Sequence, residues 1–143
     1  EIDNALMDYD YVITFDLGTA TTVNVLQVGK VPSFTGGMIA PGLRIMNAAL
    51  HQYTAKLPLV DNLNLGSFLG NNTENSIRSG LINSTIGLAE RVYSHFYALS
   101  AEIKIFVTGG YADVLMPHLQ IPFQYEEFLN LIGIYSIYYR NRK

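Results

Sequence analysis

The segment that most constrains the fold is residues 16–22, Asp-Leu-Gly-Thr-Ala-Thr-Thr, because it joins two runs of strand-forming residues. Residues 11–15 before it are β-branched or aromatic, and residues 23–28 after it return to strand composition. Such runs favour β-strands. A short connection of Gly and Thr favours a tight turn between them. The sequence therefore predicts a β-hairpin whose tip is rich in hydroxyl groups.

The rest of the chain alternates between strand and helix patterns, with no internal repeat and no linker. The expected elements are a strand at 31–39, a helix at 43–57, a long helix from 73 to about 99, a strand at 103–108, a short helix at 111–119, an extended pair at 121–122 and a closing helix at 128–139. This order of strands and helices predicts one α/β domain.

The residues of the hairpin tip suit a polyphosphate. Gly18 would let backbone N–H groups approach phosphate oxygens. Thr19, Thr21 and Thr22 could donate hydrogen bonds to the same oxygens, and Asp16 could hold a cation beside them. The alternative is an ordinary hairpin with threonines on its solvent face, because short motifs of this kind often occur without function.

Two further glycine-rich segments lie next to predicted strands. Gly36 and Gly37 begin a run of small residues that leads through Pro41 and Gly42 into a helix, and such residues let the backbone approach a ligand or another strand. The alternative is a plain turn.

Thr108, Gly109 and Gly110 end the strand at 103–108. Ligands of open α/β sheets lie beyond the carboxyl ends of strands, and two glycines leave room there for a ring or a phosphate. Thr73 starts the long helix, where anions and hydroxyl groups are attracted. A simple strand-to-helix turn and a simple N-cap are the alternatives.

Composition limits the partners. The net charge is −3 with a pI of about 5.5, and no cluster of Lys and Arg occurs before the last residues, which argues against nucleic acid. No apolar run approaches the roughly 20 residues that cross a bilayer. Cysteine is absent, so disulfides and thiolate metal sites are excluded. Without a recognisable targeting segment, the cytoplasm is the expected location.

Charged residues make up only 15% of the chain, whereas about 25% is typical of globular proteins. This apolar excess predicts a large buried interface with another domain or a second subunit. A well-filled core is the alternative.

The motifs gain specificity from their order. They are Asp-x-Gly-Thr-Ala-Thr-Thr at 16–22, Gly-Gly-x-Ile-Ala-Pro-Gly-Leu at 36–43, Ala-Lys-Leu-Pro at 55–58, Gly-x-Asn-Thr at 70–73, Ser-Gly at 79–80, Thr-Gly-Gly at 108–110 and Leu-x-Leu-x-Gly-Ile at 129–134. In this order the chain closely resembles the type III pantothenate kinases, also known as the Baf family of transcriptional activators. The resemblance covers nearly all of the chain from Tyr11 onward.

The resemblance implies an α/β fold, a ribonuclease-H-like lobe of the actin/hexokinase/Hsp70 superfamily with a mixed sheet and helices on both faces. It implies ATP-dependent phosphorylation of pantothenate, the first step of coenzyme A biosynthesis. Mg²⁺ and a monovalent cation, K⁺ or NH₄⁺, are the implied cofactors. The family is typically homodimeric, with the pantothenate pocket near the subunit interface.

Roles for individual residues follow from the same resemblance. They are a monovalent-cation ligand at Asp16, ATP contacts at Gly18, Thr19, Thr21, Gly109 and Gly110, a pantothenate contact at Thr73, and a substrate-cleft floor at Gly36 and Gly37, to which Gly42 also contributes.

Two family motifs are absent from this sequence: Asp-x-Gly-Asn-Thr, for phosphate, and Gly-x-Asp-Arg, which supplies the general base. We therefore expect residues 1–143 to be a single C-terminal lobe whose N-terminal lobe lies outside this chain. No catalytic residue is assigned, and the isolated chain is expected to be inactive because it lacks the base and a closed cleft.

Two alternatives remain at this point. One is a non-catalytic nucleotide-binding or regulatory protein of the same fold. The other is a lobe of a sugar kinase or acetate-type kinase, against which the ordered motifs argue.

Overall fold

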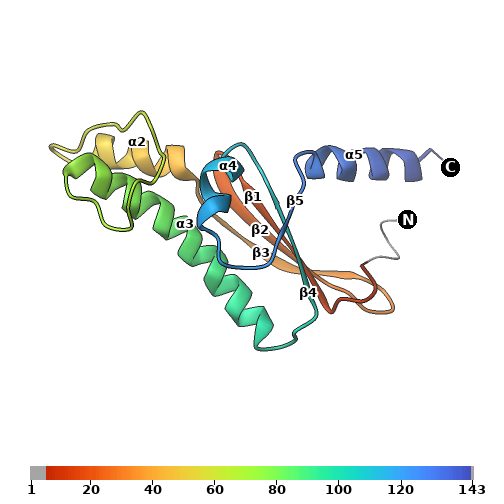
Figure 1. Cartoon of the computed structure of the whole chain (residues 1–143). Coiled ribbons are helices and arrows are strands. Elements are labelled where there is room, and N and C mark those ends of the chain that lie inside the picture. The colour runs from red at the N-terminus through yellow and green to blue at the C-terminus, as the bar shows by residue number, and fades with distance from the viewer. Residues whose placement is uncertain (1–5, 143) are drawn as a thin grey trace.

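A five-stranded mixed sheet forms the centre of the computed structural model, which describes residues 6–142 (Figure 1). The strands are β1 (Tyr11–Leu17), β2 (Ala20–Gln27), β3 (Ser33–Pro41), β4 (Ile103–Thr108) and β5 (Gln124–Tyr125). The helices are α2 (Leu43–Tyr53), α3 (Thr73–Tyr97), α4 (Ala112–Leu115), a 3₁₀ turn (Met116–His118) and α5 (Leu129–Arg140). None of the helices in this described part is long and apolar enough to cross a membrane.

The strands lie in the order β3-β2-β1-β4-β5. The β1–β2 and β2–β3 pairs are antiparallel, whereas β4 runs parallel to β1 and β5 parallel to β4. Three antiparallel strands followed by two parallel ones give the ribonuclease-H-like arrangement that the family resemblance implies. Because β1 and β4 are parallel, their carboxyl ends meet at the same edge of the sheet.

The core lies between one face of the sheet and α3. Alternate side chains of a strand point to one face, and Ile13, Phe15 and Leu17 of β1 are all buried. α3 crosses this face (Figure 1). Its buried apolar residues recur at helical spacing and join the same cluster: Ile77, Leu81, Ile82, Ile86, Ala89 and Val92.

α5 lies on the other side of the sheet. A cavity of about 760 Å³ separates Leu129 and Ile132 of α5 from Thr14 and Phe106 on the second sheet face. No residue of α5 is buried. Its exposed large side chains are Leu131, Ile134, Tyr135, Ile137, Tyr138 and Tyr139. Helices therefore lie on both faces, but α5 packs far less closely than α3.

Three predicted boundaries are wrong. The helix expected at 43–57 ends at Tyr53, because Thr54 is extended and its hydroxyl donates to the Leu50 carbonyl oxygen at 2.6 Å while accepting from the Leu57 N–H. The third strand runs from Ser33 to Pro41 rather than over 31–39. The short helix expected at 111–119 ends at Leu115 and continues as the 3₁₀ turn Met116–His118. The two-residue strand β5 was not predicted.

The loop after α2 is fixed by one buried side chain. Asn47 of α2 donates to the Val60 carbonyl oxygen at 2.7 Å and accepts from the Val60 N–H at 3.2 Å. Both bonds are buried, and the one side-chain amide satisfies both backbone groups of Val60. This contact holds the loop against α2 and so leads the chain into α3.

Candidate functional site: a glycine-lined edge of the sheet

The hairpin tip between β1 and β2 contacts the start of α2. The Gly18 N–H donates to the Ala20 carbonyl oxygen at 3.1 Å, and the Gly42 N–H donates to the Thr19 carbonyl oxygen at 3.1 Å. A Cβ at Gly42 would collide with the carbonyl oxygens of Gly18 and Thr19. Only a glycine therefore lets the backbone at residue 42 approach the tip this closely.

The turn after β4 contacts the same tip from the other side. Gly109 has a φ of +104°, a conformation that favours glycine, and a Cβ there would lie 2.5 Å from the Leu17 carbonyl carbon. The Tyr111 N–H donates to the Leu17 carbonyl oxygen at 2.9 Å. Gly110 has open space at its Cβ position. Thus Gly109 is required for packing, whereas Gly110 is free to face a ligand.

The structure thus brings together segments that are distant in sequence. Three segments meet at one edge of the sheet, which we call the glycine edge: the hairpin tip at Gly18 and Thr19, the helix entry at Gly42 and the turn at Gly109. Two segments that the sequence singles out, the hairpin tip and the Gly109 turn, therefore lie together at this edge.

Asp16 lies at the centre of this edge. It is half-buried and pairs in the sheet with Thr22 on β2 and Thr108 on β4. Its Oδ1 atom faces the two glycine turns, since a Cβ at Gly109 would lie 2.7 Å from it. Its Oδ2 atom accepts a hydrogen bond of 2.9 Å from Asn130 of α5.

The donor chemistry of Asp16 suits a cation, because hard cations take oxygen ligands. The carboxylate Oδ1 atom lies close to the backbone of Gly18 and Gly109. Within residues 6–142 no group of three or more His, Cys, Asp or Glu side chains could hold a metal ion.

Further carboxylates lie near the start of α4 and the end of β5. The pKa of the Tyr125 phenol is raised, first by desolvation and then by the carboxylates of Glu127, Asp113 and Glu126. Tyr125 is therefore a neutral hydroxyl at physiological pH.

The three hydroxyls of the tip differ in exposure. Thr19 is exposed and could reach a ligand, and Thr22 is half-buried. Thr21 is 3% exposed and shares the inward face of β2 with Val23. The geometry therefore favours Thr19 as a direct ligand contact and gives Thr21 a place in the core.

The predicted substrate residues do not lie at the tip. Gly36 and Gly37 are inside β3, opposite Val25 and Asn24 of β2, beside a register shift that marks a β-bulge. Thr73 is the first residue of α3. It lies toward the far end of α2, and α2 is roughly 16 Å long at 1.5 Å per residue.

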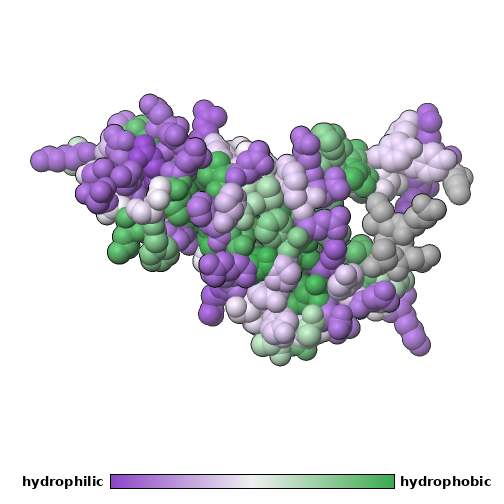
Figure 2. Space-filling model, in the orientation of Figure 1, coloured by the Kyte–Doolittle hydropathy of each residue, from purple (hydrophilic) through white to green (hydrophobic). Residues whose placement is uncertain are grey.

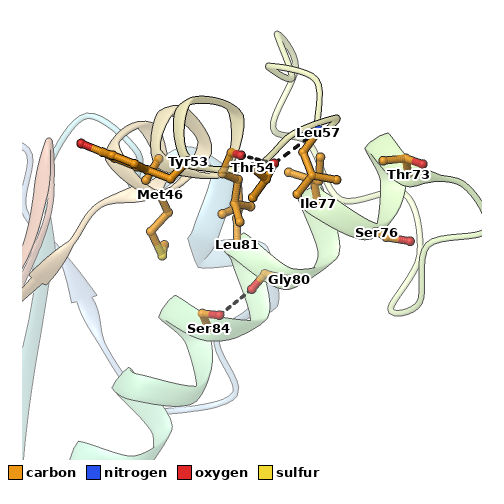
Figure 3. A pocket seen from close by; sticks show the side chains of 12 residues that line it. Met46, Tyr53, Thr54, Leu57, Thr73, Ser76, Ile77, Gly80, Leu81 and Ser84 are labelled. Carbon is orange, nitrogen blue, oxygen red and sulfur yellow. Dashed lines mark hydrogen bonds between the residues drawn. The ribbon is translucent and has the colours of Figure 1, made fainter.

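Thr73 instead lines a cavity of about 860 Å³ between α2 and α3 (Figure 3). Met46 and Tyr53 of α2 and Ile77 and Leu81 of α3 form its apolar wall. Its other lining residues are Ala49, Leu50, Thr54, Leu57, Ser76, Gly80 and Ser84. Because the Met46 N–H donates to the Gly42 carbonyl oxygen at 3.0 Å, this cavity begins one helical turn from the glycine edge.

Comparison with known proteins decides the family. The family model for type III pantothenate kinase matches residues 4–95, well over half of the chain. The chain belongs to the type III pantothenate kinase family. This match includes the hairpin tip, Gly42 and Thr73, but not the Gly109 turn.

Relatives of this pantothenate kinase family extend the match to the rest of the chain. A type III pantothenate kinase from Geobacter sulfurreducens is 35% identical over 147 aligned residues, which cover 99% of this chain and 57% of that protein. A type III pantothenate kinase from Myxococcus xanthus is 34% identical, with 98% and 56% covered. The chain therefore spans a little over half the length of these relatives.

One solved structure shows the same fold. A Campylobacter jejuni protein described as a conserved Baf family transcriptional activator has a TM-score of 0.64, with 99% of this chain and 64% of that chain covered. The sequence identity is 19%, so this likeness supports the fold and nothing finer.

Sequence analysis missed Asn130. Its contact with Asp16 joins residues 114 apart in sequence. A single Asn in an exposed, mostly apolar helix gives no local signal, and only the arrival of α5 at the sheet edge brings it to Asp16.

Proposed function

We propose that this chain is the C-terminal lobe of an enzyme that phosphorylates pantothenate with ATP, the first step of coenzyme A biosynthesis. One observation carries the proposal: in a chain of this family, two glycine turns and an exposed Thr meet around one carboxylate at a sheet edge. Phosphoryl transfer depends mainly on positioning and charge stabilisation, which are what such an edge can supply.

The roles proposed for the edge residues follow from their exposure. The Thr19 hydroxyl and the Gly18 backbone would bind phosphate oxygens, and Gly109 and Gly110 would lie against the adenosine part of the nucleotide. Asp16 would hold K⁺ or NH₄⁺ through Oδ1. When Mg²⁺ is bound to the phosphates, it would neutralise part of their charge. Thr21 would support the tip from within the core.

One exposed apolar surface supports a larger assembly. α5 exposes an apolar face, and Figure 2 shows apolar residues at the surface near the start of this helix. We propose that a second lobe, with the family's Asp-x-Gly-Asn-Thr and Gly-x-Asp-Arg motifs, closes over the glycine edge and supplies the general base. No nucleic acid or membrane partner is proposed, and the cytoplasmic location stays a prediction.

Thr73 supports the proposal of a homodimer. It is separated from the glycine edge by the length of α2, so it would contact pantothenate only if the substrate reaches along α2 or if a second copy brings it closer. Tyr53, which lines this cavity, is 80% exposed. Phe68 and Leu69, in the loop before α3, are exposed as well. Gly36 and Gly37, on the edge strand β3, would act through the shape of the sheet.

Reconstitution of the two lobes tests the proposed function. We expect no ATP turnover from the isolated chain, because it has neither the base nor a closed cleft. Fused to the portion of the Geobacter sulfurreducens relative that lies outside the match, it should form ADP only when pantothenate is present. A coupled ADP assay with and without pantothenate measures this.

The outcomes separate the proposal from its alternative. A folded fusion that binds ATP but never turns it over would favour a non-catalytic, regulatory protein of the same fold, in line with the description of the Campylobacter jejuni protein. Turnover by the isolated chain would contradict the two-lobe proposal itself.

A further inference from the structure

The hydrogen bond from α5 to the glycine edge has a specific geometric effect. Asn130 Nδ2 donates to Asp16 Oδ2 at 2.9 Å, while Asp16 Oδ1 remains directed at the turns of Gly18 and Gly109. We infer that Asn130 is a positioning residue that fixes the Asp16 carboxylate with one oxygen presented to a monovalent cation. This inference rests on the proposed cation role of Asp16.

The two oxygens of Asp16 have different surroundings. A Cβ at Gly18 would lie 3.2 Å from Oδ1, and one at Gly109 would lie 2.7 Å from it, so Oδ1 is directed toward the backbone of both turns. Oδ2 points the other way, toward α5. A hydrogen bond to one oxygen restricts rotation of the carboxylate before any ligand binds. Less conformational entropy is then lost when the other oxygen binds a cation.

The chemical type of the donor matters as much as its position. The amide of Asn130 donates without a positive charge, whereas Lys or Arg would neutralise the carboxylate. Among residues 6–142, Asp16 forms no salt bridge with a Lys or Arg side chain, so no protein cation neutralises it there.

The position of Asn130 ties this carboxylate to α5. Asn130 is the second residue of α5, and no residue of that helix is buried. The helix is therefore held loosely against the sheet. The hydrogen bond from Asn130 to Asp16 is a direct link between α5 and the glycine edge. Displacement of α5 would release Oδ2 and let the carboxylate of Asp16 turn away from the glycine edge.

Cation titration of the chain itself tests the inference. KCl is added at constant ionic strength, balanced with choline chloride, while backbone amide NMR signals of Gly18 and Gly109 are followed. The wild-type chain should show K⁺-dependent shifts that Asp16→Asn abolishes. Asn130→Ala should raise the half-saturating K⁺ concentration roughly tenfold, which corresponds to about 1.4 kcal/mol. Asn130→Gln, which keeps the amide donor, should recover part of that loss.

Ser136→Ala provides the matched control, because Ser136 is exposed on the same helix and away from Asp16. It should leave the K⁺ response unchanged. An Asn130→Ala chain that binds K⁺ like wild type would overturn the inference while leaving the proposed kinase function intact. A wild-type chain with no K⁺ response would remove the cation role of Asp16, and the inference with it, whereas reconstituted ATP turnover would still report on the proposed function.

Discussion

Gly109→Ala is expected to lower the free energy of unfolding by about 3 kcal/mol. The φ of +104° is costly for any residue with a Cβ, and strained backbone of this kind costs roughly 1–3 kcal/mol. The new methyl group would also overlap the Leu17 backbone and approach Asp16 Oδ1, and overpacking costs roughly 1–3 kcal/mol. For a chain of this size the melting temperature should fall by about 10 °C, as measured by circular dichroism.

Gly110→Ala is the matched control for this prediction. The Cβ position of Gly110 has no neighbour within 4 Å, and its φ is not positive. Its melting temperature should therefore stay within about 2 °C of wild type, because surface substitutions usually change stability by no more than about 0.5 kcal/mol. Equal destabilisation by the two substitutions would show that the turn after β4 does not pack against β1 as described.

Asp16→Asn should lower kcat of the reconstituted enzyme by about 10²-fold to 10³-fold, the range for loss of one preorganised electrostatic contact. Asn keeps the size of the side chain and removes its charge. The fold should therefore survive, while the proposed cation would lose its charged ligand. The coupled ADP assay at saturating pantothenate, repeated over a range of KCl, measures the effect.

Asp113→Asn removes an equal charge from the exposed start of α4 and serves as the control. It should change kcat by less than about threefold, because exposed charges are screened by solvent and salt. Full activity of the Asp16→Asn enzyme without KCl would exclude a cation at this residue.

Sequence patterns predicted the sheet well, because local composition determines its strands. The run at 11–15 lies within β1, and the strand at 103–108 matches β4. Boundaries failed where side chains compete with the backbone. Thr54 ends α2 early by bonding the Leu50 carbonyl, an interaction that apolar periodicity does not register.

The candidate site was predicted in part. The glycine turns were singled out because they stand at strand ends, and the parallel pairing of β1 with β4 brings Gly18 beside Gly109. The position of Thr73 could not be predicted, because it depends on how α2 and α3 pack. Asn130 could not be predicted either, since its role arises only from the tertiary arrangement of α5.

The most direct test of the central claim is the location of nucleotide binding on the chain. Mg²⁺–ATP is added at millimolar concentration to the ¹⁵N-labelled chain, and backbone amide shifts are mapped residue by residue. We expect the largest shifts at Gly18, Thr19, Gly109 and Gly110, with Gly80 in the cavity between α2 and α3 unaffected. Largest shifts at that cavity, or none anywhere, would contradict the assignment of the glycine edge as the nucleotide site.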